Sequence, residues 1–405
     1  MLKVLAIGYV WPEPNSSAAG THMLSNLKTF QTQGWKVTFA TPAARSEHMV
    51  DLAELAIDAV DIELNNASFD IFVAELQPDI VLFDRFMMEE QFGWRVEQHC
   101  PQAMRILDTV DLHFLRQARH NAYKQKRPLN PEDLRSDMAK REIAAILRCD
   151  LSLIISKVEF ELLQKEFSVD PCLLHHLPFM LTQLETPLPD HHQRQGFVTI
   201  GNFRHAPNWD AVLWLKDNIW PLIRKQLPSA QLHICGAYPP PKATALHAPK
   251  QGFHVLGWVK DANLEMQQAR VCLAPLRFGA GIKGKLAEAM LNGTPNVTTP
   301  VGAEAMADGL DWSGFICESA QEIADKAVAL YQDEALWQQC QQQGFTIIDA
   351  NYDRAKLSVE LIDAVRHQLD NLSEIRNNNF TGAMLRHHSH KSTQYMAQWI
   401  EAKNK

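Results

Sequence analysis

A short segment rich in glycine and lysine carries the strongest chemical signal in the sequence. Residues 278–288 read FGAGIKGKLAE and contain three glycines and two lysines: Gly279, Gly281, Gly284, Lys283 and Lys285. Glycines let the backbone approach a ligand closely, and the free amides at the start of a helix bind phosphate without a special side chain. The two lysines add positive charge at the same place. The segment therefore predicts a phosphate-binding site.

Two common phosphate-binding patterns can be laid over this segment, but neither matches its context. In a P-loop, a Ser or Thr after the lysine holds Mg²⁺, and Leu286 stands at that position. In a dinucleotide-binding fold, the glycines belong to the first strand–helix unit and an acidic residue follows about 20 positions later. Glu304 has that spacing, but the segment follows the fourth predicted strand of its half. An ATPase and a nicotinamide or flavin enzyme are therefore both disfavoured.

Polar residues also follow predicted strands in the first half of the chain. Residues 108–116 read DTVDLHFLR and follow the apolar stretch at 105–107. Because ligands bind at the carboxyl ends of parallel strands, side chains at such positions are expected at a cleft. The candidates are polar side chains that come directly after predicted strands: Asp84, Arg85, Asp111, His113 and Arg116.

A regular alternation of strands and helices positions these candidates. Apolar stretches of strand length recur in two series, at 3–8, 36–40, 80–83, 105–107 and 151–155, then at 197–200, 231–235, 253–256, 271–274 and 296–299. Helix-length segments separate them, which is typical of parallel βαβ winding. The sequence therefore predicts an α/β protein with two facing, Rossmann-like, doubly wound domains.

The ends of these two domains can also be placed. The polar segment 182–195 contains two prolines and shows no periodicity, so it marks a linker. Helical patterns at 357–369 and 393–402 are separated by the polar residues 377–382, and a terminal helix is expected to pack back on the first half. The predicted units are a first domain, a second domain and a helical tail: 1–185, 196–365 and 366–405.

Composition restricts the class of protein. The 405 residues include 39 Lys+Arg and 47 Asp+Glu, a net charge of −8, and 46% are hydrophobic, which excludes a disordered chain. No apolar run reaches the roughly 18 residues of a membrane span, and the apolar start is too short for a signal peptide. The seven cysteines contain no C-x-x-C pair. We therefore expect a cytoplasmic protein with reduced thiols and, at a pI near 6.1, no nucleic-acid partner.

The residues that continue the glycine and lysine segment resemble a known family. From Glu288 to Glu304 the chain reads EAMLNGTPNVTTPVGAE, which is similar to the donor-binding segment of retaining GT-B glycosyltransferases of family 4, the glycosyl transferases group 1. Residues 201–212 resemble the first phosphate-side loop of that domain. Residues 256–261 resemble its base-binding loop, and residues 11–20 resemble the N-terminal glycine loop. The order and spacing of these motifs match over about residues 1–345.

The resemblance implies roles for residues of the second half. Glu288 would accept hydrogen bonds from the donor ribose, and Lys283, Lys285 and Arg204 would surround the donor diphosphate. The other donor-binding positions would be Gly257, Trp258, Gly279, Gly281, Ile282 and Glu304. One departure concerns Ala280, because many members carry a glutamate eight positions before the one that corresponds to Glu288. The identity of the donor sugar is therefore left open.

The resemblance also implies roles in the first half. His113 would hydrogen-bond the transferred sugar, with Asp111 beside it. The loop residues Ser17, Gly20 and Thr21 would meet the donor phosphate or the acceptor. No two aspartates are two positions apart, so the D-x-D metal clamp of the other major transferase fold is absent, and no metal or other cofactor is expected.

These observations predict a glycosyltransferase that moves a sugar from a nucleotide-sugar to a glycan or lipid-linked acceptor, with retention and without a metal. A nucleotide-sugar epimerase of the same fold and a non-catalytic sugar-nucleotide-binding protein are the alternatives. Residues 112–131 contain five Lys/Arg and no acid. This stretch fits either a solvated basic helix or a surface for an anionic membrane or a phosphate-bearing acceptor, with peripheral contact at the inner membrane face.

Overall fold

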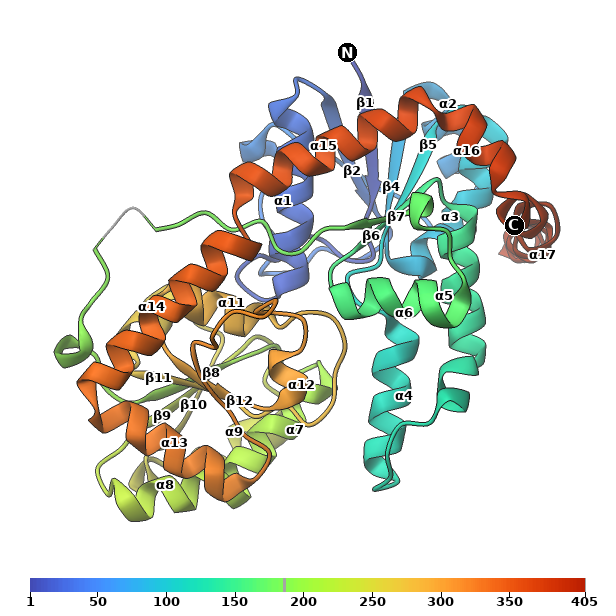
Figure 1. The fold of residues 1–405 in the computed structure, drawn as a ribbon. Helices are drawn as coiled ribbons and strands as arrows, with labels where there is room; N and C mark the ends of the chain where they lie inside the picture. The colour runs from blue at the N-terminus through green and yellow to red at the C-terminus, as the bar shows by residue number, and fades with distance from the viewer. Residues whose placement is uncertain (185–186, 405) are drawn as a thin grey trace.

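The computed structural model describes residues 1–184 and 187–404, without the side chains of residues 388–390. Within this part the chain forms two α/β domains, each built on a parallel sheet with helices on both faces (Figure 1). The predicted fold class is thereby confirmed. Part of the predicted linker, residues 185–186, lies outside the described residues.

The first domain contains a seven-stranded parallel sheet in the order β3-β2-β1-β4-β5-β6-β7. Its strands are β1 Lys3–Ile7, β2 Lys36–Thr41, β3 Asp58–Asp61, β4 Ile80–Asp84, β5 Met104–Asp108, β6 Leu151–Ile154 and β7 Leu174–His176. The central strands are buried on both faces, so they read as continuous apolar runs in the sequence. The strand order reverses between β1 and β4, where a ligand crevice is expected.

The second domain repeats this plan with a six-stranded parallel sheet in the order β10-β9-β8-β11-β12-β13. Its strands are β8 Phe197–Ile200, β9 Leu232–Cys235, β10 Phe253–Gly257, β11 Val271–Ala274, β12 Asn296–Thr298 and β13 Gly314–Ile316. The order reverses between β8 and β11. The glycine and lysine segment follows β11 and therefore lies at this switch point.

Helices cover the faces of both sheets. Those of the first domain are α1 Ala18–Thr32, α2 Ser68–Leu76, α3 Arg85–His99, α4 His113–Lys124, α5 Asp137–Arg148 and α6 Lys157–Phe167. Those of the second are α7 Ala206–Trp214, α8 Trp220–Gln226, α9 Pro241–Thr244, α10 Ala262–Gln268, α11 Gly284–Leu291, α12 Pro300–Ala303, α13 Ala320–Gln332 and α14 Glu334–Asn351. Short 3₁₀ turns lie at Ala53–Leu55, Pro131–Arg135, Pro171–Leu173, His191–Gln193 and Pro249–Gln251, and a π-helical turn at Leu215–Ile219 joins α7 to α8.

Three strands at or near the sheet edges were absent from the sequence prediction. They are β3, β7 and β13, which read DAVD, LHH and GFI. Each has four residues or fewer and keeps exposed or half-buried positions, so it carries no apolar run. Pairing with a neighbouring strand, rather than local composition, decides that these segments are extended.

The chain returns to the first domain at its C-terminal end, as predicted (Figure 1). The returning helices are α15 Arg354–Asp370, α16 Leu372–Asn378 and α17 Phe380–Asn404. Leu357, Leu361 and Val365 of α15 pack in the same core as strands β1 and β4, and the predicted boundary at residue 365 falls within this helix. The polar segment 377–382 is not the separator we expected, because only Asn379 interrupts the helices. Its side chain accepts from the amide of Gly382 at 2.8 Å.

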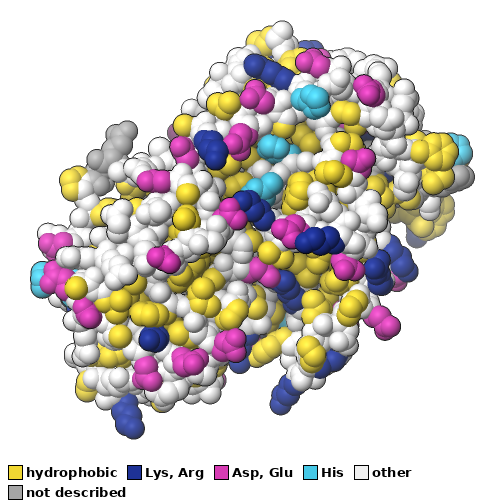
Figure 2. Space-filling view, viewed as in Figure 1, with side chains coloured by type: hydrophobic (Ala, Val, Ile, Leu, Met, Phe, Trp, Pro, Cys, Tyr) yellow, Lys and Arg dark blue, Asp and Glu magenta, His cyan; other side chains and the backbone are white. Residues whose placement is uncertain are grey.

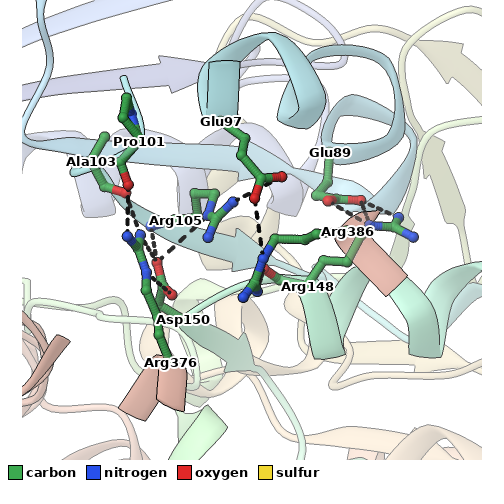
Figure 3. Close-up of polar contacts among 9 residues, drawn as sticks. All are labelled: Glu89, Glu97, Pro101, Ala103, Arg105, Arg148, Asp150, Arg376 and Arg386. Atoms are coloured by element: carbon green, nitrogen blue, oxygen red, sulfur yellow. Dashed lines mark hydrogen bonds and ion pairs between the residues drawn. The ribbon is translucent and has the colours of Figure 1, made fainter. Parts of the chain in front are cut away.

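Ion pairs anchor the returning helices (Figure 3). Arg376 of α16 binds both carboxylate oxygens of Asp150, each at 2.8 Å. Arg386 of α17 lies 3.4 Å from Glu97, and Arg105 of β5 lies between the two acids, within 3.7 Å of each. Asp150 is 2% exposed, so its charge depends on these partners for stabilisation.

Candidate functional site: a cationic cleft between the two domains

A cleft of about 710 Å³ separates the two domains. Its walls are the loops that follow β1, β4 and β5 in the first sheet and β8, β9 and β11 in the second, which are the carboxyl ends around the two switch points. Figure 2 shows charged side chains of both signs beside hydrophobic ones along the junction of the domains. The cleft thus lies where the topology predicts a ligand.

The glycine and lysine segment forms one wall of this cleft. Gly279, Ile282 and Lys283 line it directly. Gly281 has a φ of +63°, and a Cβ at this position would come within 2.9 Å of the Cβ of Asp111, so a side chain is excluded. The Lys283 ammonium donates to the carbonyl oxygen of Gly281 at 2.6 Å. Burial lowers the pKa of Lys283 to about 8.

Lys285 lies on the same wall, one step into α11. Its ammonium donates to Oδ1 of Asn208 at 2.8 Å. A Cβ on Gly201 would come within 2.7 Å of this ammonium, so the glycine leaves the space that the lysine uses. Burial also lowers the pKa of Lys285 to about 8. Among the described residues no side chain caps the start of α11, and its first amides stay available for an anion.

Glu288 lines the cleft one turn after Lys285. Positions i and i+3 of a helix share a face, so both side chains can address one ligand. Burial raises the pKa of Glu288, and the positive charge of Lys285 lowers it again in part. The raised pKa reports that the carboxylate is poorly solvated there. Hydroxyl donors from a ligand would stabilise it.

The opposite wall comes from the loop after β5. His113 and Asp111 lie 3.4 Å apart, and Arg116 hydrogen-bonds Asp111. Burial raises the pKa of Asp111, but Arg116 and His113 outweigh it and hold the pKa at about 2. Burial lowers the pKa of His113 to about 4. At neutral pH the loop therefore presents a carboxylate and an uncharged imidazole.

Arg85 extends this wall at the end of β4. It pairs with Asp84 at 2.8 Å and lies over the ring of Tyr9, whose centroid is 5.3 Å away. Arg85 and Tyr9 both line the cleft. Burial raises the pKa of Asp84, although Arg85 lowers it in part.

Aromatic rings gather at the end of the cleft beside the loop after β10. Arg204 lies over the ring of Tyr238 at 3.6 Å, and Tyr238 donates to Glu13 of the first domain at 2.7 Å. Trp258 stacks on His48, also of the first domain, with ring centroids 4.7 Å apart. Gly257, immediately before Trp258, has a φ of +74° and turns the chain there.

Six predicted residues do not line the cleft: Gly20, Thr21, Asp84, Gly257, Gly281 and Glu304. Glu304 pairs instead with Arg119 of α4 at 2.6 and 2.8 Å. Thr21 donates to the carbonyl oxygen of Pro14, and Gly20 lies against the backbone of Glu13. These two residues shape the N-terminal loop, whereas Ser17 lines the cleft and also caps α1.

His205 and Tyr238 are among the cleft residues that sequence reasoning did not single out. His205 follows β8, is packed near Asp111, and has its pKa lowered to about 4 by burial. Tyr238 follows β9. Their signal was their position directly after strands, the same signal that selected His113.

Among the described residues, one group could hold a metal ion, and it lies outside the cleft lining. It consists of His191, His192 and Glu334. Six of the cysteines are buried and Cys172 is exposed, all as free thiols. No helix in the described part of the chain is both long enough and apolar enough to cross a membrane.

Comparison with known proteins connects this geometry to a family. A family model described as glycosyl transferases group 1 matches residues 194–333. The fold resembles TarM from S. aureus, solved in complex with fondaparinux, alpha-GlcNAc-glycerol and UDP, with a TM-score of 0.69 at 10% identity over 90% of this chain and 99% of that chain. HepE from Anabaena, solved with UDP and glucose, gives 0.67 at 10% identity over 90% and 100%. WaaG, described as a glycosyltransferase involved in lipopolysaccharide biosynthesis, gives 0.63 at 14% over 89% and 98%. No curated protein sequence matches the chain.

Proposed function

We propose that the chain is a glycosyltransferase of the GT-B fold, whose second domain is similar to the glycosyl transferases group 1. It would transfer a sugar from a nucleotide-sugar to a glycan or lipid-linked acceptor, with retention and without a metal ion. One observation carries this proposal. Lys283, Lys285 and Glu288 line one wall of the cleft at the start of α11, and His113 and Asp111 line the wall opposite.

The second domain would hold the donor. The lysines and the free amides of α11 would bind the diphosphate, with Arg204 beside them, and Glu288 would accept from the ribose hydroxyls. As the bond between the sugar and the diphosphate breaks, its electron pair passes to the departing phosphate oxygen. Cations already aimed at that oxygen stabilise the growing charge without reorganisation.

The first domain would hold the sugar and the acceptor. The uncharged imidazole of His113 can donate to, or accept from, a sugar hydroxyl. Asp111 is a weak base, because Arg116 and His113 hold its pKa at about 2. We therefore assign the acceptor proton to the departing phosphate, while the acceptor oxygen forms its bond to the sugar carbon on the same face.

The acceptor could also be recognised through charge. Of the five cations in residues 112–131, three arginines are in ion pairs: Arg116, Arg119 and Arg127. Lys124 and Lys126 are exposed at the end of α4. These two lysines could contact a phosphate-bearing acceptor or an anionic membrane surface, which is the basis for proposing peripheral contact at the inner membrane face.

A ligand screen followed by product analysis tests the proposal. UDP and UDP-glucose are the first probes, because TarM and HepE structures contain UDP or UDP-glucose. A probe at a hundred times its Kd should add about 2.7 kcal/mol of stability in a thermal-shift assay. The bound nucleotide-sugar should then yield a glycoside on an added acceptor. An epimerised donor without glycoside would instead identify an epimerase, and binding without turnover would identify a binding protein.

Replacing Glu288 with Gln should weaken UDP binding about tenfold, because a charge-assisted hydrogen bond contributes about 1.5–3 kcal/mol and a neutral one about 1 kcal/mol. Calorimetry with UDP and 2′-deoxy-UDP checks the cause. The variant should lose less than the wild type on going to the deoxy ligand. Equal losses would show that Glu288 does not bind the ribose. Glu334→Gln, a change on α14 outside the cleft lining, is the control.

Addition of EDTA should change the rate of donor turnover by less than about twofold, because Lys283, Lys285 and Arg204 line the cleft and would neutralise the diphosphate in place of a divalent ion. The measurement compares initial rates with and without chelator, and after Mn²⁺ or Mg²⁺ is restored. Loss of turnover that only the added metal reverses would contradict the metal-free mechanism.

A further inference from the structure

The loop at residues 278–284, which carries Lys283, is held largely by side chains of the first domain. Glu159 of α6 is fully buried. Its Oε1 accepts from the amide of Leu112, in the first-domain loop, at 3.1 Å and from the amide of Gly281, in the second-domain loop, at 2.7 Å. One carboxylate oxygen thus joins the two walls of the cleft. Its Oε2 has no hydrogen-bond partner within the described residues.

A second contact holds the loop at Gly279, two residues before Gly281. Arg119 of α4 donates to the carbonyl oxygen of Gly279 at 2.9 Å while it pairs with Glu304. The adjacent residue, His120, stacks on Phe278, with ring centroids 4.2 Å apart and planes within 8°. Helix α4 therefore runs along the second domain, as the ribbon shows (Figure 1).

The composition of the loop explains why outside contacts matter. Three glycines give it more backbone freedom than other residues would, and ordering that backbone costs conformational entropy. The side chain of Ala280 has no polar group that could hydrogen-bond within the loop. The only carboxylate that binds a loop amide among the described residues 279–283 comes from Glu159.

We propose that Arg119 and Glu159 are positioning residues: through them the first domain sets the conformation of the 278–284 loop and with it the position of Lys283. The catalytic consequence rests on the proposed function. The structural claim does not, because it concerns the free protein. The proposal also assigns a role to Glu304, because its ion pair with Arg119 holds the arginine in place.

Hydrogen exchange on the full-length protein without ligand tests the structural claim. In Glu159→Ala the peptide that contains Gly281 should exchange about tenfold faster than in the wild type, as expected for the loss of one hydrogen bond. Glu159→Gln keeps an acceptor oxygen and should stay close to the wild type. Glu142→Ala is the matched control, since Glu142 accepts only from the first-domain amides of His113 and Phe114 at 3.1 and 2.9 Å.

Substitutions of Arg119 test the second contact without relying on the buried carboxylate. Arg119→Glu should speed exchange of the same peptide, because a carboxylate cannot donate to the Gly279 carbonyl oxygen, whereas Arg119→Lys keeps a donor and a positive charge and should keep much of the protection. Arg127→Ala, which breaks a pair with Asp133 inside the first domain, should leave the peptide unchanged. Unchanged exchange in both Glu159→Ala and Arg119→Glu, or equal acceleration in the controls, would overturn the proposal.

Activity adds a second readout. If the wild type transfers sugar, Glu159→Ala should lower kcat about tenfold or more while Glu159→Gln retains most of it, since only the alanine removes the acceptor oxygen. A wild type that shows no transfer with any donor would contradict the proposed function and leave the exchange result standing. Normal kcat in Glu159→Ala would overturn the positioning role.

Discussion

Binding of UDP falls by about a hundredfold or more when Lys283 and Lys285 are both replaced by methionine, because two charge-assisted hydrogen bonds of about 1.5–3 kcal/mol each are lost. Both ammonium groups line the cleft, and in the free protein they donate only to the Gly281 carbonyl and the Asn208 amide oxygen. Methionine keeps most of the side-chain volume. The loss should therefore report charge rather than packing.

The pH dependence of the same binding gives an independent check. Burial lowers the pKa of each lysine to about 8, so both lose their protons in the free protein as the pH rises through that value. UDP affinity should fall between pH 7 and pH 9.5 in the wild type, and this fall should vanish in the double variant. Calorimetry at moderate salt measures both.

The control for this prediction is Lys225→Met with Lys250→Met, two exposed lysines of the same domain outside the cleft. Without ligand, the cleft double variant should be at least as heat-stable as the wild type, because it removes two poorly solvated charges. An affinity equal to that of the control would contradict a phosphate-binding role for these lysines.

Replacing Asp150 with Ala lowers the free energy of unfolding by about 3–5 kcal/mol, because it leaves arginines of a buried network without their counter-charge. Asp150 accepts from Arg376 of α16 at 2.8 Å and from the backbone amide of Arg105 at 2.8 Å. Arg105 is 4% exposed, so water cannot replace the lost partner. The C-terminal helices should also loosen from the first domain, which exchange of α16 and α17 would show (Figure 3).

At acid pH, the difference in the free energy of unfolding between the wild type and Asp150→Ala should become smaller. Burial raises the pKa of Asp150, but the hydrogen bond and charge of Arg376 and the charge of Arg105 outweigh it, so the pKa in the folded protein is lowered. The contribution is therefore complete above the unfolded pKa of about 3.9 and is lost as the pH falls below that value. Denaturant unfolding at pH 7 and pH 3 measures the change.

The exposed pair of Asp137 and Lys140 provides the control for this prediction. Their side chains are 94% and 73% exposed, so solvent screens the pair and Asp137→Ala should change the free energy of unfolding far less than Asp150→Ala. A loss for Asp150→Ala that is no larger than that of Asp137→Ala at pH 7 would show that the network does not stabilise the fold.

Local patterns in the sequence were enough to predict the central strands and the glycine and lysine segment. Central strands of a parallel sheet are buried on both faces, so their apolar runs predicted the middle of each sheet. The glycine and lysine segment could be placed at a helix start, because glycine spacing and the following helical pattern are both local. Position after a strand selected Asp111 and His113 for the same reason, whereas the role of Glu288 came from the family resemblance. The roles assigned to these residues in catalysis stay predictions.

Only the tertiary structure decided which distant residues meet. The family resemblance made Glu304 a donor-binding candidate, but Arg119, 185 positions away, pairs with it. Nothing local distinguished Glu159 from any other helix glutamate, although its carboxylate joins the two walls of the cleft. The short edge strands β3, β7 and β13 likewise carried no sequence pattern that predicts a strand. An ion pair, an interdomain hydrogen bond and an edge strand each depend on a partner that is distant in the sequence. Because such contacts do not require a periodic pattern of residues, the sequence near them does not predict them.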